Sequence, residues 1–150
     1  MNRVLVSQDG DGAPREIGGV AVDPKAVVSF PDGLPGFELC RSFVLLSSPE
    51  MEPLQQLRSV DGPEASFVGI DPKLILPTYR CELSEFDRER LGAKDDSVLL
   101  WLAIIGIDAD GTTTANLRAP VVINPENMTG RQVMPHRCLY ALRHVITEIE

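Results

Sequence analysis

The stretch VLLWLAIIGI, residues 98–107, carries apolar residues on both of the alternating faces that an extended strand presents. Its length also permits a helix, but Trp101, several β-branched residues and Gly106 favour a strand buried on both sides. Residues 108–111, Asp-Ala-Asp-Gly, form a turn signal, and residues 112–117 return as the partner strand of a hairpin. The stretch therefore predicts the centre of a β fold.

Outward from this run, short apolar segments rich in β-branched residues are separated by Pro, Gly or Asp about every eight to twelve residues. This spacing is typical of an all-β sandwich or barrel. Residues 73–79 read as a bridge between elements. The other expected strands are residues 17–22, 26–30, 42–46, 54–60, 66–70, 120–123, 132–134 and 139–144.

One short helix is predicted, over residues 84–91. Ser84 is a favourable N-cap, and Glu85 and Asp87 lie at the positive end of the helix dipole. Gly92 follows as a stop signal. The fold class expected from the sequence is therefore mostly β, with a single short helix.

Length and composition indicate one globular domain. The chain has 150 residues, of which 43% are hydrophobic and 24% charged, as in ordinary globular proteins. Residues 1–14 contain two glycines, a proline and two aspartates, so we expect a flexible N-terminal leader there. A single β domain is then expected over residues 15–150.

The charge balance argues against binding to a phosphate backbone. Fourteen Lys and Arg stand against 22 Asp and Glu, a formal net charge of -8 with a pI near 4.7. Direct nucleic-acid binding is therefore not expected, and a basic protein partner fits better. The acidity also has a simpler reading, as a means of solubility.

Cysteine usage and hydropathy bear on the compartment. The three cysteines, Cys40, Cys81 and Cys138, are odd in number and lack metal-ligand spacing, so we expect neither a disulfide framework nor a zinc site. The start of the chain has no apolar signal region, and no run approaches the roughly 18 apolar residues of a membrane span. We expect a soluble, cytoplasmic protein with no membrane association.

Candidate catalytic groups are few, and we expect neither enzymatic activity nor a cofactor. His136 and His144 are the only histidines, and neither has an oriented nucleophile nearby in the sequence. The alternative is a small-molecule-binding or hydrolytic β-barrel whose site is scattered along the chain. Its polar members would be His136, Glu82 and Asp95. Direct RNA binding is a third possibility, which the charge disfavours.

The stretch FPDGLPGFELC, residues 30–40, contains two turn signals in series. Residues 31–33 form the first, and Pro35-Gly36 suits a type II turn with Pro at i+1 and Gly at i+2. The two turns hold Leu34 and Phe37 in a fixed relation. These side chains either plug the end of a barrel or form an exposed apolar surface preorganised for a partner.

A second segment, TANLRAPVVINPENMTGRQV at residues 114–133, combines a strand, an Asn-Leu pair, two proline steps and a Gly-Arg-Gln return. The remaining motifs are GLPGFE at residues 33–38, FVGIDP at residues 67–72 and YALR at residues 140–143. Taken together, in this order and spacing, they closely resemble the bacterial flagellar assembly factor FliW. The resemblance covers residues 15–145.

The resemblance implies a cytoplasmic protein with a small antiparallel barrel-like fold and no catalytic activity. Members of the family bind the translational regulator CsrA, a basic RNA-binding dimer, away from its RNA surface and prevent it from repressing flagellin mRNA. They also bind flagellin, and free flagellin displaces CsrA. We expect partner contacts at Leu34, Phe37 and Glu38, and at Asn116, Leu117 and Pro120. The alternative is that these motif residues mainly shape turns.

Overall fold

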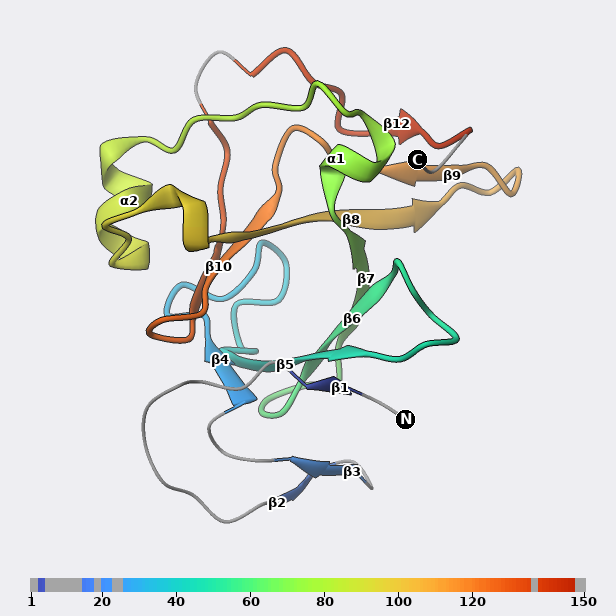
Figure 1. Ribbon diagram of the computed structural model, residues 1–150. Coiled ribbons are helices and arrows are strands. Elements are labelled where there is room, and N and C mark those ends of the chain that lie inside the picture. Colours follow the sequence, from blue (N-terminus) through green and yellow to red (C-terminus); the bar gives the residue numbers. More distant parts are fainter. Residues whose placement is uncertain (1–2, 5–14, 18–19, 23–25, 136–137, 148–150) are drawn as a thin grey trace.

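The computed structural model describes residues 3–4, 15–17, 20–22, 26–135 and 138–147 (Figure 1). Seven strands form a closed barrel, which confirms the predicted mostly β, barrel-like fold. Neighbouring barrel strands pair antiparallel except β11 and β4, which pair in parallel through Thr129 and Ser29. The barrel strands are β4 (Val27–Ser29), β5 (Ser42–Ser47), β6 (Gln55–Ser59), β7 (Ser66–Ile70), β8 (Leu100–Ile107), β10 (Val121–Asn124) and β11 (Thr129–Gln132).

Strand β8 pairs with three other strands, β7, β10 and β9. Its first half pairs with β10, which closes the barrel, and its second half pairs with β9 (Thr113–Ala115), the return strand of the predicted hairpin. A short strand, β12 (His144–Val145), extends this pairing on the far side of β9. The strand therefore belongs both to the barrel wall and to a second sheet beside it.

The apolar character of both faces of β8 has a direct explanation in the packing. Leu102 and its neighbours two residues away point into the barrel, while Trp101 packs against a cluster outside it. Ala103 and Ile105 face a third cluster, beneath the C-terminal segment. The end of the strand differs from the prediction, because Ile107 is 75% exposed where the strand leaves the barrel wall.

The barrel interior is filled by apolar side chains from all around the wall. Gly130 in β11 is needed for this packing, because a Cβ there would lie 2.4 Å from Cζ of Phe30. The rings of Phe30 and Phe43 meet edge to face at a centroid distance of 5.1 Å. The buried members of this cluster are Val28, Phe30, Leu34, Cys40, Phe43, Leu45, Leu57, Ala65, Leu102, Val121, Ile123 and Met128.

The predicted helix is confirmed as α2 (Glu85–Leu91), which packs outside the barrel. Ser84 caps it by accepting a hydrogen bond from the backbone N–H of Asp87 at 3.0 Å, and Gly92 ends it with φ 61°. A second helix, α1 (Pro72–Ile75), occupies part of the region expected to be a bridge. Asp71 caps it, and a 3₁₀-helix, Asp96–Val98, precedes β8.

Several predicted strand boundaries were wrong. The strand expected over residues 17–22 is a pair, β2 (Arg15–Ile17) and β3 (Val20–Val22), on either side of a Gly-Gly step. The strand expected at 132–134 is β11, which ends instead at residue 132. Its last residue, Gln132, pairs with Val121, the first residue of β10. Of residues 139–144, only the last belongs to a strand.

Most of the predicted N-terminal leader, residues 1–2 and 5–14, lies outside the described residues, so its flexibility stays a prediction. Within it, β1 (Arg3–Val4) pairs antiparallel with β5. The helices of the described part are all short, and none has the length and apolarity that crossing a membrane requires.

Candidate functional site

The segment at residues 30–40 folds as two consecutive tight turns, as predicted. The backbone N–H of Gly33 donates to the carbonyl of Phe30 at 2.8 Å, and that of Phe37 donates to the carbonyl of Leu34 at 2.7 Å. Gly36 has φ 85°, as the third position of a type II turn requires. The loop is therefore rigid and projects its side chains in fixed directions.

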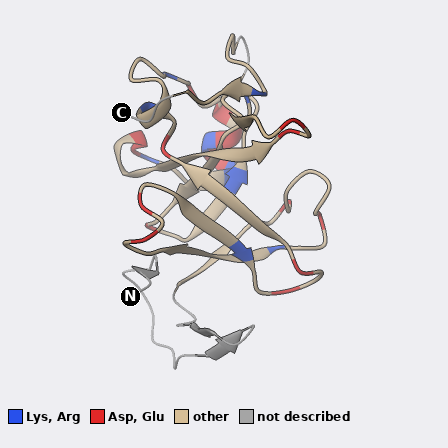
Figure 2. Cartoon of the chain, turned by 90° about the vertical axis from the view of Figure 1, so that its right-hand side faces the viewer, with Lys and Arg blue, Asp and Glu red and all other residues tan. Residues whose placement is uncertain are grey.

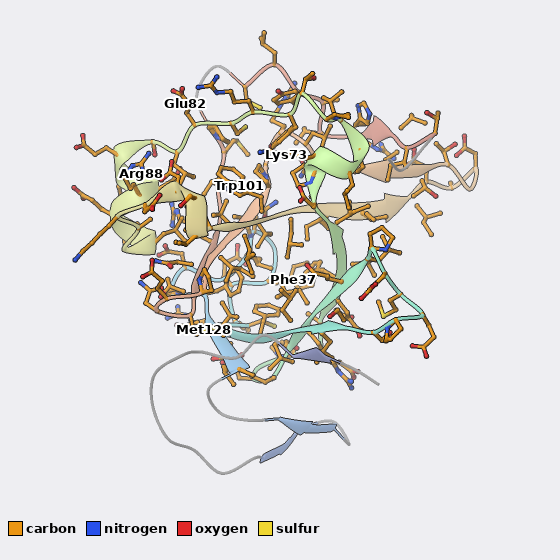
Figure 3. The ribbon with its side chains drawn as sticks, viewed as in Figure 1. Phe37, Lys73, Glu82, Arg88, Trp101 and Met128 are labelled. Carbon is orange, nitrogen blue, oxygen red and sulfur yellow. The ribbon has the colours of Figure 1, made fainter. Side chains whose placement is uncertain are left out.

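Phe37 joins this loop to the barrel wall. Its ring meets the ring of Phe67 on β7 edge to face, with the two centroids 5.0 Å apart. The ring of Phe67 in turn packs against the ring of Phe43, with a centroid distance of 6.2 Å. In the view of Figure 3, Phe37 lies within the ring of barrel strands. Leu34 is buried, whereas Phe37 remains 41% exposed. The loop thus plugs the barrel with one side chain and presents the other to solvent.

Glu38 follows Phe37 and is exposed. Its Oε1 accepts a hydrogen bond from the backbone N–H of Gly36 at 3.1 Å. Hydrogen bonding to that backbone N–H lowers the pKa of the Glu38 carboxyl below its ordinary value. The loop therefore carries a fixed negative charge beside an exposed aromatic ring.

The second predicted segment is mostly internal. Asn116 Oδ1 accepts hydrogen bonds from the backbone N–H groups of Arg118 at 3.2 Å and Ala119 at 2.9 Å, which shapes the turn after β9. Leu117 and Pro120 are buried. The segment's alternative role, that of shaping turns, accounts for these contacts.

A groove brings the two predicted segments together. It is a hollow of about 380 Å³ between the loop at 30–40, the outer end of β8 and the C-terminal segment. Its lining is mainly apolar, and its rim carries an ion pair between Arg143 and Asp108. Ile107 and Leu142, on the same side, are well exposed. The lining includes Leu34, Phe67, Ile104, Ile107, Asn116 and Leu142.

The chain is similar to known proteins in sequence and in fold. The sequence model of the FliW protein family matches residues 13–146. The chain belongs to the FliW family. It is 34% identical over 136 residues to the flagellar assembly factor FliW of Caldanaerobacter subterraneus subsp. tengcongensis, covering 89% of this chain and 91% of that relative. The FliW of Alkaliphilus metalliredigens is 33% identical, covering 89% of this chain and 84% of the relative.

The fold agrees as well. A crystal structure of the flagellar assembly factor FliW matches this FliW chain with a TM-score of 0.77 at 34% identity. The match covers 91% of this chain and 96% of the solved one. The resemblance expected from the ordered motifs is therefore confirmed, and the chain is a flagellar assembly factor by family.

The six predicted contact residues of this FliW chain fall into two groups. Phe37 and Glu38 are exposed, and Asn116 lines the groove. Leu34, Leu117 and Pro120 are buried, although Leu34 also lines the groove, and a role in partner contact stays a prediction for all six residues. Sequence cannot separate the two groups, since turn-forming motifs look alike whichever way their apolar side chains point.

The sequence missed two exposed groove residues, Ile107 and Leu142. Ile107 is the last residue of β8, directly before the hairpin turn. A large apolar residue at a strand end, next to a turn rich in aspartate, is the signal that would have found it. Leu142 lies in the YALR motif, whose position near the groove depends on tertiary structure.

Arg131 and Arg143, two arginines of the C-terminal third, form ion pairs with acidic side chains. Arg131 Nε lies 2.7 Å from Asp87 Oδ1, and the same guanidinium pairs with Asp32. Arg143 pairs with Asp108. Arg137 lies outside the described residues.

The structure describes two of the three residues of the alternative hydrolytic site, Glu82 and Asp95, and these two do not line a common hollow. Asp95 caps the 3₁₀-helix by accepting from the backbone N–H of Ser97 at 2.9 Å. Glu82 lines a different hollow, and His136 lies outside the described residues. Among the residues that the structure describes, no three His, Cys, Asp or Glu side chains are placed to hold a metal ion.

A second hollow, of about 470 Å³, lies between α1 and the start of β8. Its lining mixes Trp101, Lys73 and Arg80 with Asp71 and other residues (Figure 3 labels Trp101 and Lys73). Burial raises the pKa of the neighbouring Tyr79, whose hydroxyl donates to the carbonyl of Leu117 at 2.8 Å. Tyr79 is therefore a structural hydrogen-bond donor at neutral pH.

Proposed function

We propose that this FliW chain is a non-enzymatic assembly factor of the cytoplasm that binds CsrA and flagellin in exchange for one another. Binding to CsrA prevents repression of flagellin mRNA, and free flagellin releases CsrA to shut off flagellin synthesis. The observation that carries the proposal is the apolar groove, which unites the rigid loop at residues 30–40 with the segment after β9.

The groove has the character of a protein-binding surface. Exposed large apolar side chains lie on or beside it, among them Phe37, Ile107 and Leu142. Because two tight turns fix the loop that carries Phe37, little conformational entropy is lost when a partner docks. Exposed apolar side chains gathered around a hollow are typical of interaction sites.

The charge supports the same partner choice. The chain has a net charge of -8, and Figure 2 shows acidic residues of the described part at several turns between strands. Examples are Glu50 and Glu52 after β5, and Asp61 and Glu64 after β6. An acidic surface accelerates encounter with a basic dimer such as CsrA more than it strengthens the complex. Such a balance suits exchange, because a partner that has to be released needs a modest interface and not a very strong complex.

Calorimetric titration with purified CsrA, repeated after saturation with flagellin, tests the proposal. We expect CsrA to bind the free protein and to give no heat of binding once flagellin occupies it. Absence of CsrA binding to the free protein, or undiminished binding in the presence of flagellin, would contradict the exchange.

A groove variant tests the location. Ile107→Glu places a charge at a site that is already 75% exposed, so the fold is retained. We place both partners at least partly over this groove, and expect each affinity to fall by about tenfold, as for a contact worth about 1.4 kcal/mol. Leu139→Glu is the matched control, because Leu139 is 95% exposed and lies outside the groove lining.

A further inference from the structure

Two cysteines that are 57 residues apart in the sequence lie together in the structure. The Sγ atoms of Cys81 and Cys138 are 3.9 Å apart, and both residues are partly buried free thiols. Cys81 lies in the segment between α1 and α2, and Cys138 in the segment between β11 and β12. Nothing in the spacing of the cysteines along the chain indicates this pairing.

Contacts of neighbouring residues hold the segments that carry Cys81 and Cys138 against one another. The rings of Tyr79 and Tyr140 pack with centroids 4.5 Å apart, and the backbone N–H of Arg80 donates to the Tyr140 hydroxyl at 2.9 Å. The Tyr79 hydroxyl lies 3.3 Å from Cys81 Sγ. The thiols are therefore side by side because the backbones that carry them are tied together by neighbouring residues.

The pair is also accessible to small reagents. Both thiols line a hollow of about 380 Å³, together with Arg80, Glu82 and Leu139. Cys40 is different, since it is 1% exposed inside the barrel and its thiol donates to the carbonyl of Pro63 at 3.0 Å. The structure thus separates one sequestered thiol from two that are open to an oxidant.

We propose that Cys81 and Cys138 form a redox modification site, which closes to an intramolecular disulfide on reaction with a low-molecular-weight disulfide such as oxidised glutathione. One cysteine, as its thiolate, attacks the glutathione disulfide, forms a mixed disulfide and releases one glutathione. The second cysteine then attacks the mixed disulfide, forms the Cys81–Cys138 bond and releases the other glutathione. The protein loses two protons and two electrons, and two glutathione thiols are formed.

The geometry makes attack of the second cysteine on the mixed disulfide faster than reaction of the mixed disulfide with thiols in solution. A disulfide requires an S–S distance of about 2.05 Å, so the sulfurs must approach by about 2 Å, within the range of side-chain rotation. The neighbouring thiol is already present at a high effective concentration. A mixed disulfide at either cysteine is therefore resolved within the molecule.

The cross-link would act on the wall of the groove. Cys138 begins the segment that carries Leu142 and Arg143 to the groove, and Cys81 is anchored beside the Tyr79 contact with Leu117. A bond between them fixes the start of this segment against the rest of the domain. The redox site itself does not depend on the identity of any partner.

The test is to equilibrate the full chain with oxidised and reduced glutathione at several ratios, block free thiols, and identify tryptic peptides by mass. Cleavage after Arg80, Arg88, Arg137 and Arg143 leaves the cysteines in CELSEFDR and CLYALR. We expect these two peptides to appear as one linked species, with Cys40 blocked as a free thiol. Dithiothreitol should return the two separate peptides.

Two variants control the assignment. Cys40→Ala should still give the linked species, and Cys138→Ser should replace it with a glutathione adduct on Cys81. The oxidised wild-type protein should also melt about 5 °C or more above the reduced form, since the bond closes a long loop. Stable glutathione adducts on wild-type Cys81 or Cys138, links that involve Cys40, or no oxidation across the series would each overturn the proposal.

Discussion

The ring of Phe37 packs edge to face on the ring of Phe67, with the two centroids 5.0 Å apart. This contact connects an exposed loop to the aromatic side chains that fill the barrel, because Phe67 also contacts Phe43. Phe37 therefore has a structural role and an exposed surface at once. The two roles are separable by experiment, since stability and partner affinity respond to different changes in the loop.

Replacing Phe37 tests both roles. Phe37→Ala removes one aromatic pair and part of a buried ring, so we expect a loss of about 1–2 kcal/mol in the free energy of unfolding. Glu38→Lys reverses the charge of an exposed residue and should leave the fold unchanged. The double variant should lower affinity for CsrA and flagellin more than Phe37→Ala alone.

Urea unfolding and calorimetric titration of the three variants give the measurements. If the double variant is folded and binds both partners as the wild type does, the loop at residues 30–40 is a barrel plug and not a contact surface.

Two glycines in the same loop differ in what surrounds them. Gly33 has φ 65°, and a Cβ there would lie 2.7 Å from Cα of Glu38, a backbone atom that cannot move aside. Gly36 has φ 85° but nothing within 4 Å of its Cβ position. We expect Gly33→Ala to cost about 2–4 kcal/mol of stability, and Gly36→Ala about 1 kcal/mol.

The difference in stability loss between the two variants measures the steric contact at residue 33, because in both variants alanine is forced into the left-handed conformation. Thermal melts at neutral pH give the comparison. Equal losses would mean that the loop relaxes around residue 33 and is less rigid than its hydrogen bonds indicate.

Local signals in the sequence were sufficient for the elements they define. The apolar run at β8 predicted a central strand because its alternate residues face different clusters, all of them apolar. Ser84 and Gly92 predicted both ends of α2, since capping depends only on nearby backbone groups. The turn before β9 was predicted for the same reason, with Gly111 at φ 86°.

Features that depend on contacts between distant segments could not be predicted from local patterns in the sequence. Closure of the barrel depends on pairing β11 with β4 and β10 with β8, which no local pattern encodes. The groove has the same origin, because its walls come from seven separate stretches of the chain between Leu34 and Arg143. Helix α1, four residues long, is too short to show a helical period.

The ion pair between Arg131 and Asp87 joins α2 to β11. Asp87 is buried, and its carboxylate accepts from Arg131 Nε at 2.7 Å and from the Ser84 hydroxyl at 3.0 Å. Arg131→Met leaves this carboxylate short of a partner, so we expect a loss of about 2–4 kcal/mol. The measurement is the free energy of unfolding in urea.

The exposed pair of Arg143 and Asp108 provides the matched control. The Arg143 side chain is 69% exposed, so Arg143→Met should cost less than about 0.5 kcal/mol. A loss at Arg131 no larger than that at Arg143 would show that the Asp87 carboxylate is solvated when its partner is removed.

The turn between β8 and β9 should respond to acid. Asp110 Oδ1 accepts from the backbone N–H of Thr112 at 3.0 Å, and this hydrogen bond lowers the pKa of the Asp110 carboxyl below its ordinary value. A carboxyl with a lowered folded pKa stabilises the turn above its unfolded pKa, and the contribution is lost as pH falls through the folded pKa. The amide resonance of Thr112 should therefore titrate with a midpoint below about 3.9, the reference value for Asp.

Asp110→Asn is the control for this titration. The amide oxygen still accepts from Thr112, so the turn is kept while the titrating group is removed. The acid-dependent shift of the Thr112 resonance should disappear in this variant. A wild-type midpoint at or above about 3.9 would mean that the hydrogen bond to Thr112 does not favour the ionised carboxylate in solution.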